Sequence, residues 1–290
     1  MDLSWTNLGS YCGLNVSNNL RFLNIVCTSW LKLRDIRNIS IAPSNPLAKV
    51  TDIAEMVRIS RDVSFNATSR EITVVVDSTW SPPNVTQPLK LGADVSIHSA
   101  TKYLGGHSDV VLGVATVSLL SDTGLRLSSV LKSIQQSIGS VASPFDCWLT
   151  LRGIRSLRVR VRRAMKTALK IAQFLDNHPN VQKTHYPGLE SHSGHLVAKQ
   201  QMKGGFGAML SFEVENEAMA MAVAGAVQIF RRATSLGGTE SLIEHRFSIE
   251  PEGRKVSHPA LLRVSVGLED ARDLIEDLDN ALNIAKVVCP

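Results

Sequence analysis

The sequence predicts an α/β protein with a parallel-rich sheet, followed by a smaller α+β domain. A short β-branched run, "ITVVVD" at 72–77, is typical of a buried parallel strand. Two further strand-like segments, 94–99 and 109–118, follow after a short helical turn that ends at Gly92. Strand, crossover and strand in this order favour an α/β layer with a parallel-rich sheet.

Changes in pattern along the chain predict three parts. Residues 1–39 lack clear periodicity and form an atypical N-terminal segment, 40–148 form a large domain, and 149–290 form a smaller C-terminal domain. A helix is expected at 52–60, and a connector, "NATSRE", before the first strand. In the C-terminal part, "HPNVQKTHYPGL" carries turn residues. There we expect strands at 206–214 and 261–269 and helices at 151–170, 216–230 and 270–285.

Bulk composition indicates an ordinary globular chain. The 290 residues are 44% hydrophobic and 20% charged, and no apolar run has membrane-spanning length. The first residues show neither a basic region nor an apolar core typical of a signal peptide. The cysteines lie far apart and form no C-x-x-C pair, so their spacing favours neither a zinc site nor a disulfide framework. This predicts a reducing compartment, most simply the cytoplasm. The cysteines are Cys12, Cys27, Cys147 and Cys289.

Much of the net charge of +5 comes from the segment 151–170. A helix with one solvated basic face explains this segment better than a nucleic-acid site, because no aromatic residues stand between the arginines to stack on bases. The apolar stripe of that helix has spacings of three and four. It consists of Leu151, Ile154, Leu157, Val161, Ala164, Ala168, Ala172 and Leu175.

A lysine follows the second strand in "HSATKYLGGHSD", 98–109. Asp77 ends the first strand, and ligands of open α/β sheets bind beyond the carboxyl ends of strands. Lys102 can therefore serve as a point charge for a phosphate or as a Schiff-base nucleophile. The phosphate-loop pattern G-x-x-x-x-G-K-[ST] is absent, which weakens the first option.

Pyridoxal phosphate requires both a Schiff-base lysine and a carboxylate. The carboxylate keeps the pyridine nitrogen protonated, and the ring then takes up carbanion charge. Hydroxyl groups beside the lysine, on Ser99 and Thr101, can donate to the phosphate ester. The structural alternative, which spacing alone leaves open, is a surface lysine in a turn and an aspartate that caps a helix.

The run from Asp77 to Gly113, "DSTWSPPNVTQPLKLGADVSIHSATKYLGGHSDVVLG", resembles the Cys/Met-metabolism family of pyridoxal-phosphate enzymes. The resemblance continues through "PSNPLAKVTDIA", "SPFDCWLTLRGIRSL", "SLGGTESLIEH" and "LLRVSVGLEDARDLIEDL", and it covers about residues 40 to 285. It implies the fold-type I transferase architecture, here with an incomplete large domain. The family includes cystathionine synthases and lyases, methionine γ-lyases and O-acylhomoserine sulfhydrylases.

The resemblance assigns five cofactor-binding residues. Lys102 matches the lysine that binds pyridoxal 5'-phosphate as a Schiff base and moves protons during catalysis, and Asp77 matches the partner of the ring nitrogen. Ser99 and Thr101 match phosphate contacts, and Asn45 matches an asparagine near the ring hydroxyl and the substrate carboxylate. No metal site is implied.

The substrate contacts are assigned in the same way. Arg263 matches the arginine that binds the substrate α-carboxylate, a bidentate task suited to guanidinium. Ser235 and Asn45 match residues near that carboxylate, whereas His98 and His107 are interpreted as structural.

The chain departs from the family pattern in two places. A phosphate-cradling loop, a tyrosine that stacks on the ring and an arm to the neighbouring subunit are not legible in 1–39, which implies a chain lacking the first part of the large domain. Such a chain is expected to bind the cofactor weakly. The run 245–259, "HRFSIEPEGRKVSHP", also differs from the family's "HPASMTH", so the distal substrate contacts do not carry over.

The resemblance implies a trans-sulfuration enzyme of sulfur amino-acid metabolism that acts on small amino acids such as cystathionine, O-acylhomoserine and cysteine. The segment "SLGGTESLIEH" favours cystathionine γ-synthase, in which cysteine replaces the γ-substituent of O-acylhomoserine. The alternatives are a cystathionine β- or γ-lyase, a methionine γ-lyase, or a non-catalytic subunit. A homodimer or homotetramer is expected, with neither nucleic acid nor membrane as partner.

Overall fold

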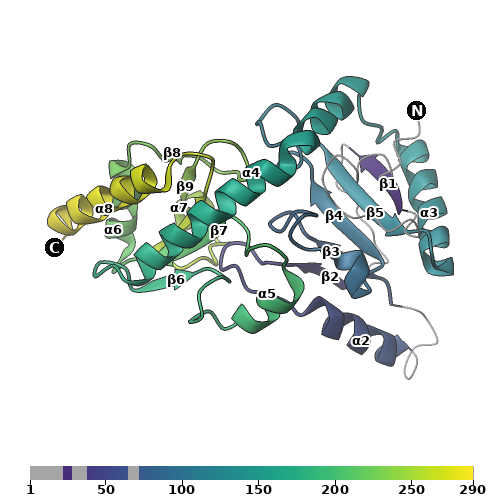
Figure 1. Ribbon diagram of the computed structural model, residues 1–290, viewed down its shortest axis with the longest axis horizontal. Coiled ribbons are helices and arrows are strands. Elements are labelled where there is room, and N and C mark those ends of the chain that lie inside the picture. Colours follow the sequence, from purple (N-terminus) through teal and green to yellow (C-terminus); the bar gives the residue numbers. More distant parts are fainter. Residues whose placement is uncertain (1–21, 28–37, 65–71, 290) are drawn as a thin grey trace. The chain divides into compact units, whose positions relative to one another are not determined.

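The computed structural model describes residues 22–27, 38–64 and 72–289, and these form two compact units (Figure 1). The N-terminal unit contains the described residues up to Pro43 together with Thr51–Arg158 and Gln200–Gly204. The C-terminal unit contains Ser44–Val50, Val159–Lys199 and the chain from Gly205 onward.

The N-terminal unit is built on a five-stranded mixed sheet. Strands β2 (Asn38–Ile41), β3 (Val74–Asp77) and β4 (Val95–Ser99) are parallel neighbours. Strand β5 (Gly113–Ser118) pairs antiparallel with β4, and β1 (Phe22–Cys27) pairs antiparallel with β5. The expected strands are therefore confirmed, and the sheet order is β1-β5-β4-β3-β2.

Both faces of this sheet are covered, which explains the uninterrupted β-branched run of β3. Val75 packs on one face, in a cluster that includes Leu131 of α3 (Asp122–Ile138). Val74 and Val76 point to the other face and pack with Ile53 of α2 (Ile53–Val63). Alternate residues of a strand point to opposite faces, so a strand buried on both sides needs apolar side chains at every position. The short helix η2 (Pro88–Leu91) ends at Gly92, as expected, with φ at +98°.

Three elements of this unit were not foreseen, namely β1, β2 and α3. The prediction of an irregular N-terminal segment is wrong at Phe22–Cys27, which forms β1. Its pairing partner, β5, lies about ninety residues later in the sequence, so local periodicity carries no sign of it. Helix α3 was also missed, although its Ser121 N-cap accepts a hydrogen bond from the N–H of Gly124. The connector "NATSRE", 66–71, lies outside the described residues.

The C-terminal unit is an α+β layer with a largely antiparallel sheet. The strands lie in the order β6 (Lys183–His185), β7 (Met209–Glu213), β10 (Leu261–Ser265), β9 (Leu242–His245) and β8 (Arg231–Arg232). All neighbours are antiparallel except β8 and β9. The helices are α5 (His195–Gln201), α6 (Glu217–Ala226), α7 (Arg246–Ile249) and α8 (Ala271–Val288), and α6 packs on α8. Two expected strands and two expected helices are thus confirmed, whereas β6 forms where only turns were expected.

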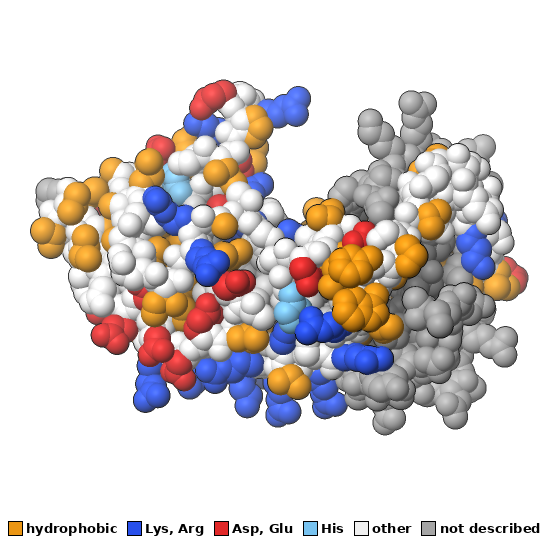
Figure 2. Space-filling view, turned by 90° about the horizontal axis from the view of Figure 1, so that it is seen from above, with side chains coloured by type: hydrophobic (Ala, Val, Ile, Leu, Met, Phe, Trp, Pro, Cys, Tyr) orange, Lys and Arg blue, Asp and Glu red, His pale blue; other side chains and the backbone are white. Residues whose placement is uncertain are grey.

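A single long helix, α4 (Pro144–Asp176), contributes to both units, and the division falls between Arg158 and Val159. Its predicted apolar stripe is buried apart from the half-buried Leu151, and its basic face is exposed apart from Arg160. Lysine and arginine side chains form a row along the lower edge of Figure 2. Among the residues that the structure describes, no helix is long and apolar enough to cross a membrane. Within the same residues, no cluster of His, Cys, Asp or Glu side chains can hold a metal ion.

Candidate cofactor and substrate site

The first group of candidate residues gathers at the carboxyl ends of β3 and β4. Asp77 is the last residue of β3, Ser99 is the last residue of β4, and the two strands are parallel neighbours. Thr79 links the two ends: its N–H donates to Asp77 Oδ1 at 2.9 Å, and its Oγ1 accepts from the N–H of Ser99 at 2.8 Å. The half-buried carboxylate of Asp77 is therefore held in one orientation at the sheet edge.

Lys102 lies in a tight turn directly after β4. Its N–H donates to the Ser99 carbonyl at 3.1 Å, and its own carbonyl accepts from the N–H of Gly106 at 2.7 Å. Thr101 closes the turn, because its Oγ1 accepts from the N–H of Leu112 at 3.0 Å while its hydroxyl proton is left to donate. Backbone hydrogen bonds on both sides thus fix the lysine beside the end of β4.

Gly153 allows helix α4 to pack against the backbone of this turn, and Gly105 allows the turn itself to close tightly. A Cβ added to Gly153 of α4 would lie 2.1 Å from the carbonyl oxygen of Gly105 and 2.6 Å from that of Leu104. A Cβ on Gly105 itself would lie 2.7 Å from Cγ1 of Val110 and 2.9 Å from the carbonyl oxygen of Ala100. Only hydrogen fits at either position, which gives a steric reason for the first glycine of the Gly-Gly and for the glycine of "LRGIRSL".

The two histidines of the motif make contacts within their own strand and turn. His98 is 5% exposed, and burial lowers its pKa to about 4, so the ring is neutral at pH 7. Its Nε2 lies 3.3 Å from the hydroxyl of Ser96. His107 Nδ1–H donates to the Gly105 carbonyl at 2.7 Å, which adds a further bond to the lysine turn.

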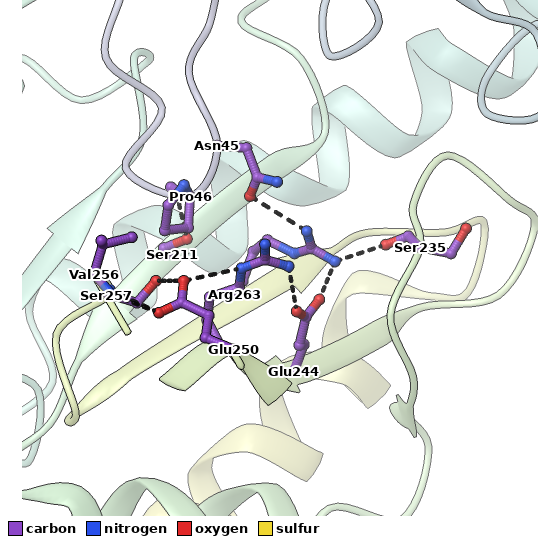
Figure 3. Close-up of polar contacts among 10 residues, drawn as sticks. Asn45, Pro46, Ser211, Ser235, Glu244, Glu250, Val256, Ser257 and Arg263 are labelled. Atoms are coloured by element: carbon purple, nitrogen blue, oxygen red, sulfur yellow. Dashed lines mark hydrogen bonds and ion pairs between the residues drawn. The ribbon is translucent and has the colours of Figure 1, made fainter. Parts of the chain in front are cut away.

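The second group of candidate residues lies in the C-terminal unit around Arg263 (Figure 3). Arg263 sits in the middle of β10, and its side chain is only 5% exposed. Its Nη1 donates to Asn45 Oδ1 at 3.3 Å, and its Nη2 donates to the backbone carbonyl of Ser235 at 3.0 Å. Ser235 adopts φ +121°, an uncommon conformation for a residue other than glycine. Asn45, Ser235 and Arg263 are therefore brought together, as the resemblance implies.

An acidic residue that the sequence reasoning missed shares this site. Glu244 on β9 lies directly opposite Arg263 on β10, and its Oε2 forms an ion pair with Nη2 of Arg263. Burial lowers the pKa of Arg263, whereas the charge of Glu244 raises it, and a guanidinium stays protonated in either case. Glu244 belongs to the segment "SLIEH", which the sequence analysis quoted. Its position opposite Arg263 depends on the register of β9 against β10, and a local sequence pattern does not predict that register.

The ion pair continues into a longer charged network. Arg246 Nη1 contacts Glu244 Oε1 at 3.0 Å, and Arg246 Nε lies 3.5 Å from Glu250 Oε1. Glu250 accepts from the hydroxyl of Ser257 at 2.6 Å and from the N–H groups of Ser257 and Val256. The Ser257 bonds foremost lower the pKa of Glu250 to about 2, so this carboxyl is ionised. Arg246 and Glu250 both belong to the run that departs from the family pattern.

Comparisons with known proteins match both halves of the chain. Residues 41–283 match the family model described as Cys/Met metabolism PLP-dependent enzyme. A cystathionine gamma-lyase of Bacillus subtilis is 42% identical over 247 residues, covering 83% of this chain and 62% of that protein. A cystathionine gamma-synthase of Mycobacterium bovis is 41% identical over 245 residues, covering 83% and 60%.

A solved structure agrees with these matches. The cystathionine gamma synthase of Xanthomonas oryzae pv. oryzae, in complex with cystathionine, superimposes with a TM-score of 0.76 at 40% identity, covering 86% of this chain and 63% of that one. The chain therefore spans about three fifths of the length of the curated relatives that it matches. The α/β architecture expected from the sequence agrees with fold-type I.

Proposed function

Because the chain belongs to the Cys/Met metabolism family of PLP-dependent enzymes, we propose that it binds pyridoxal 5'-phosphate at Lys102 and acts on sulfur-containing amino acids. The observation that carries the proposal is the edge of the N-terminal sheet. There Asp77 and Ser99 end adjacent parallel strands, and the next turn holds Lys102 by its backbone.

The donor set of the N-terminal unit fits this cofactor. An amine, a carboxylate and two hydroxyls are the groups that its aldehyde, ring nitrogen and phosphate require, and Lys102, Asp77, Ser99 and Thr101 supply them. Thr79 holds Asp77 by one carboxylate oxygen and leaves the other oxygen to accept a proton-bearing nitrogen. Gly153 of α4 packs directly against the backbone of the turn at Leu104 and Gly105.

Bound pyridoxal phosphate supplies an electron-withdrawing ring that takes up carbanion charge from an amino acid. The residues of the chain supply the rest. Asp77 holds the proton on the ring nitrogen, and the amine of Lys102 removes and returns protons at substrate carbons. Arg263 binds the substrate α-carboxylate through its guanidinium charge, and Asn45 Oδ1 accepts a hydrogen bond from Nη1 of that group.

Within the family we propose the γ-synthase reaction, the replacement of the γ-substituent of O-acylhomoserine by cysteine. The segment "SLGGTESLIEH" supports this choice. The lyase reaction is the second candidate, since the relatives include lyases of comparable identity. We further propose a cytoplasmic location and a homodimer or homotetramer, in line with the widely spaced cysteines and the family.

Two measurements test the proposal. Borohydride reduction of the protein with bound cofactor, followed by peptide mapping, should place the pyridoxyl group on Lys102. The Asp77→Asn variant should carry the same label and lose turnover about a hundredfold. Label found mainly on another lysine would remove the core of the proposal, and a protein that stays colourless with added cofactor would indicate a non-catalytic subunit.

The reaction type needs a separate assay. The protein is incubated with O-acetylhomoserine or O-succinylhomoserine and cysteine, and cystathionine formation is followed. In parallel, cystathionine is supplied alone and keto-acid release is followed. Cystathionine formed faster than it is cleaved supports the synthase, and the reverse ratio supports a lyase.

A further inference from the structure

The carboxylate-binding arginine of the C-terminal unit already has a buried counter-ion. Glu244 has a side chain only 3% exposed, and it pairs with the same Nη2 of Arg263 that donates to Ser235 (Figure 3). A substrate carboxylate that approaches Arg263 therefore meets a second negative charge in a region of low dielectric. Without a further positive charge nearby, Glu244 would repel the substrate carboxylate and would itself neutralise the guanidinium of Arg263.

Arg246 lies on the opposite side of this carboxylate. Arg263 contacts Oε2 of Glu244, and Arg246 contacts Oε1 at 3.0 Å, so each oxygen has its own guanidinium. The side chain of Arg246 is 29% exposed, whereas that of Arg263 is 5% exposed. The carboxylate of Glu244 thus lies between a buried cation, Arg263, and a more exposed one, Arg246.

Arg246 has a second acidic neighbour, Glu250, but its contact with Glu250 is weaker than its contact with Glu244. Glu250 lies 3.5 Å away, but its carboxylate is stabilised mainly by Ser257 and by the N–H of Val256. Three short hydrogen bonds to Glu250 leave Arg246 as a weaker partner of that group. The stronger contact of Arg246, at 3.0 Å, is the one to Glu244.

We propose that Arg246 is a positioning residue that compensates the charge of Glu244 and so keeps Arg263 able to bind a substrate carboxylate. The inference rests on the proposed role of Arg263. Arg246 lies in the run 245–259, which departs from the family pattern. Without Arg246, Glu244 would hold Arg263 more tightly and compete with the ligand.

The test measures carboxylate affinity in the protein loaded with pyridoxal phosphate. The probes are L-alanine and L-alaninamide, because both carry the amine, only the first carries the carboxylate, and neither has a γ-substituent to lose. Binding is followed by the change in visible absorption of the bound cofactor. Arg246→Met should weaken L-alanine about tenfold, a change expected from one charge-assisted contact, and should leave L-alaninamide unchanged.

Two further variants separate charge compensation from a general structural role. Arg246→Lys keeps the charge and should retain most of the affinity for L-alanine. In a Glu244→Gln background, Arg246→Met should have less than about a twofold effect, because the charge to be compensated is gone. The Glu244→Gln pair also keeps the test decisive if Arg246→Met alone does not fold.

The possible failures are distinguishable. Equal affinity of wild type and Arg246→Met for L-alanine, with the preference over L-alaninamide intact, would overturn the role of Arg246 and leave that of Arg263 standing. The same tenfold loss in the Glu244→Gln background would also overturn it. A wild-type protein that binds the two probes equally would remove the carboxylate role of Arg263 and this inference together.

Discussion

The two units hold their candidate residues by different means. In the N-terminal unit, Lys102 sits in a turn closed by backbone hydrogen bonds and by a helix that touches it through glycine. In the C-terminal unit, Arg263 is held by the side chain of Asn45, 218 residues away, and by the carbonyl of Ser235, 28 residues away. It also pairs with Glu244 on the neighbouring strand. The first arrangement is local and steric, whereas the second is distant and electrostatic. Substitutions that add volume should damage the first unit, and substitutions that alter charge geometry should damage the second.

Among the substitutions that test this contrast, Gly153→Ala should cause the largest loss of stability. The new methyl group would lie 2.1 Å from the Gly105 carbonyl oxygen, so α4 or the lysine turn must move. Overpacking of this kind costs about 3 kcal/mol of unfolding free energy, and displacement of the turn should also weaken cofactor binding. Urea unfolding and a titration with pyridoxal phosphate measure the two effects.

Gly225→Ala provides the matched control. Gly225 lies in helix α6, and a Cβ there would meet no atom within 4 Å. The exchange should therefore be neutral or should stabilise the protein by up to about 1 kcal/mol, as expected for alanine in a helix. If both alanine variants unfold at the same urea concentration as the wild type, the tight contact between α4 and the lysine turn is not a constraint.

Acid should destabilise the N-terminal unit through His98. The pKa of this buried ring is lowered to about 4, below the ordinary value of 6.5, so the folded state resists a proton that the unfolded chain accepts. Its contribution to stability is present above pH 6.5 and is lost as the pH falls from 6.5 towards 4, by about 3 kcal/mol in total. Urea unfolding at pH 7 and pH 4.5 should show the loss.

Replacing His98 by a side chain that does not titrate tests whether this ring causes the acid sensitivity. His98→Gln should have lower stability at pH 7 and a shallower loss between pH 7 and pH 4.5 than the wild type. His107→Gln is the control, because it removes an exposed histidine of the same segment. An unchanged slope in His98→Gln would assign the acid sensitivity to other groups.

The same contrast explains how much could be predicted from the sequence. The end of β3, the turn after β4 and the helix at 151–170 were predictable, because their signals are short-range: β-branched runs, a Gly-Gly and an apolar stripe. Strand β1 and the strand register that sets Glu244 against Arg263 were not, because both depend on pairing between distant segments. Glu244 lies in β9 and Arg246 begins helix α7, so their spacing of two residues in the sequence does not predict the contact between them.

The smallest effect is expected from Arg263→Lys. If the predicted loss of affinity is not found, the contrast between the two units does not hold. Lysine keeps the positive charge next to Glu244 but loses the planar fork that donates to Asn45 and Ser235 while binding a carboxylate. We expect L-alanine to bind about tenfold more weakly, roughly 1.5 kcal/mol, with no change in affinity for pyridoxal phosphate, which Lys102 and its neighbours would hold. Titrations followed by absorption give both constants.

Arg272→Lys is the control, because that side chain is 92% exposed and lies at the start of α8. Unchanged affinity for L-alanine in Arg263→Lys would show that charge alone suffices at this position, and the fork geometry of the C-terminal unit would then have no part in recognition.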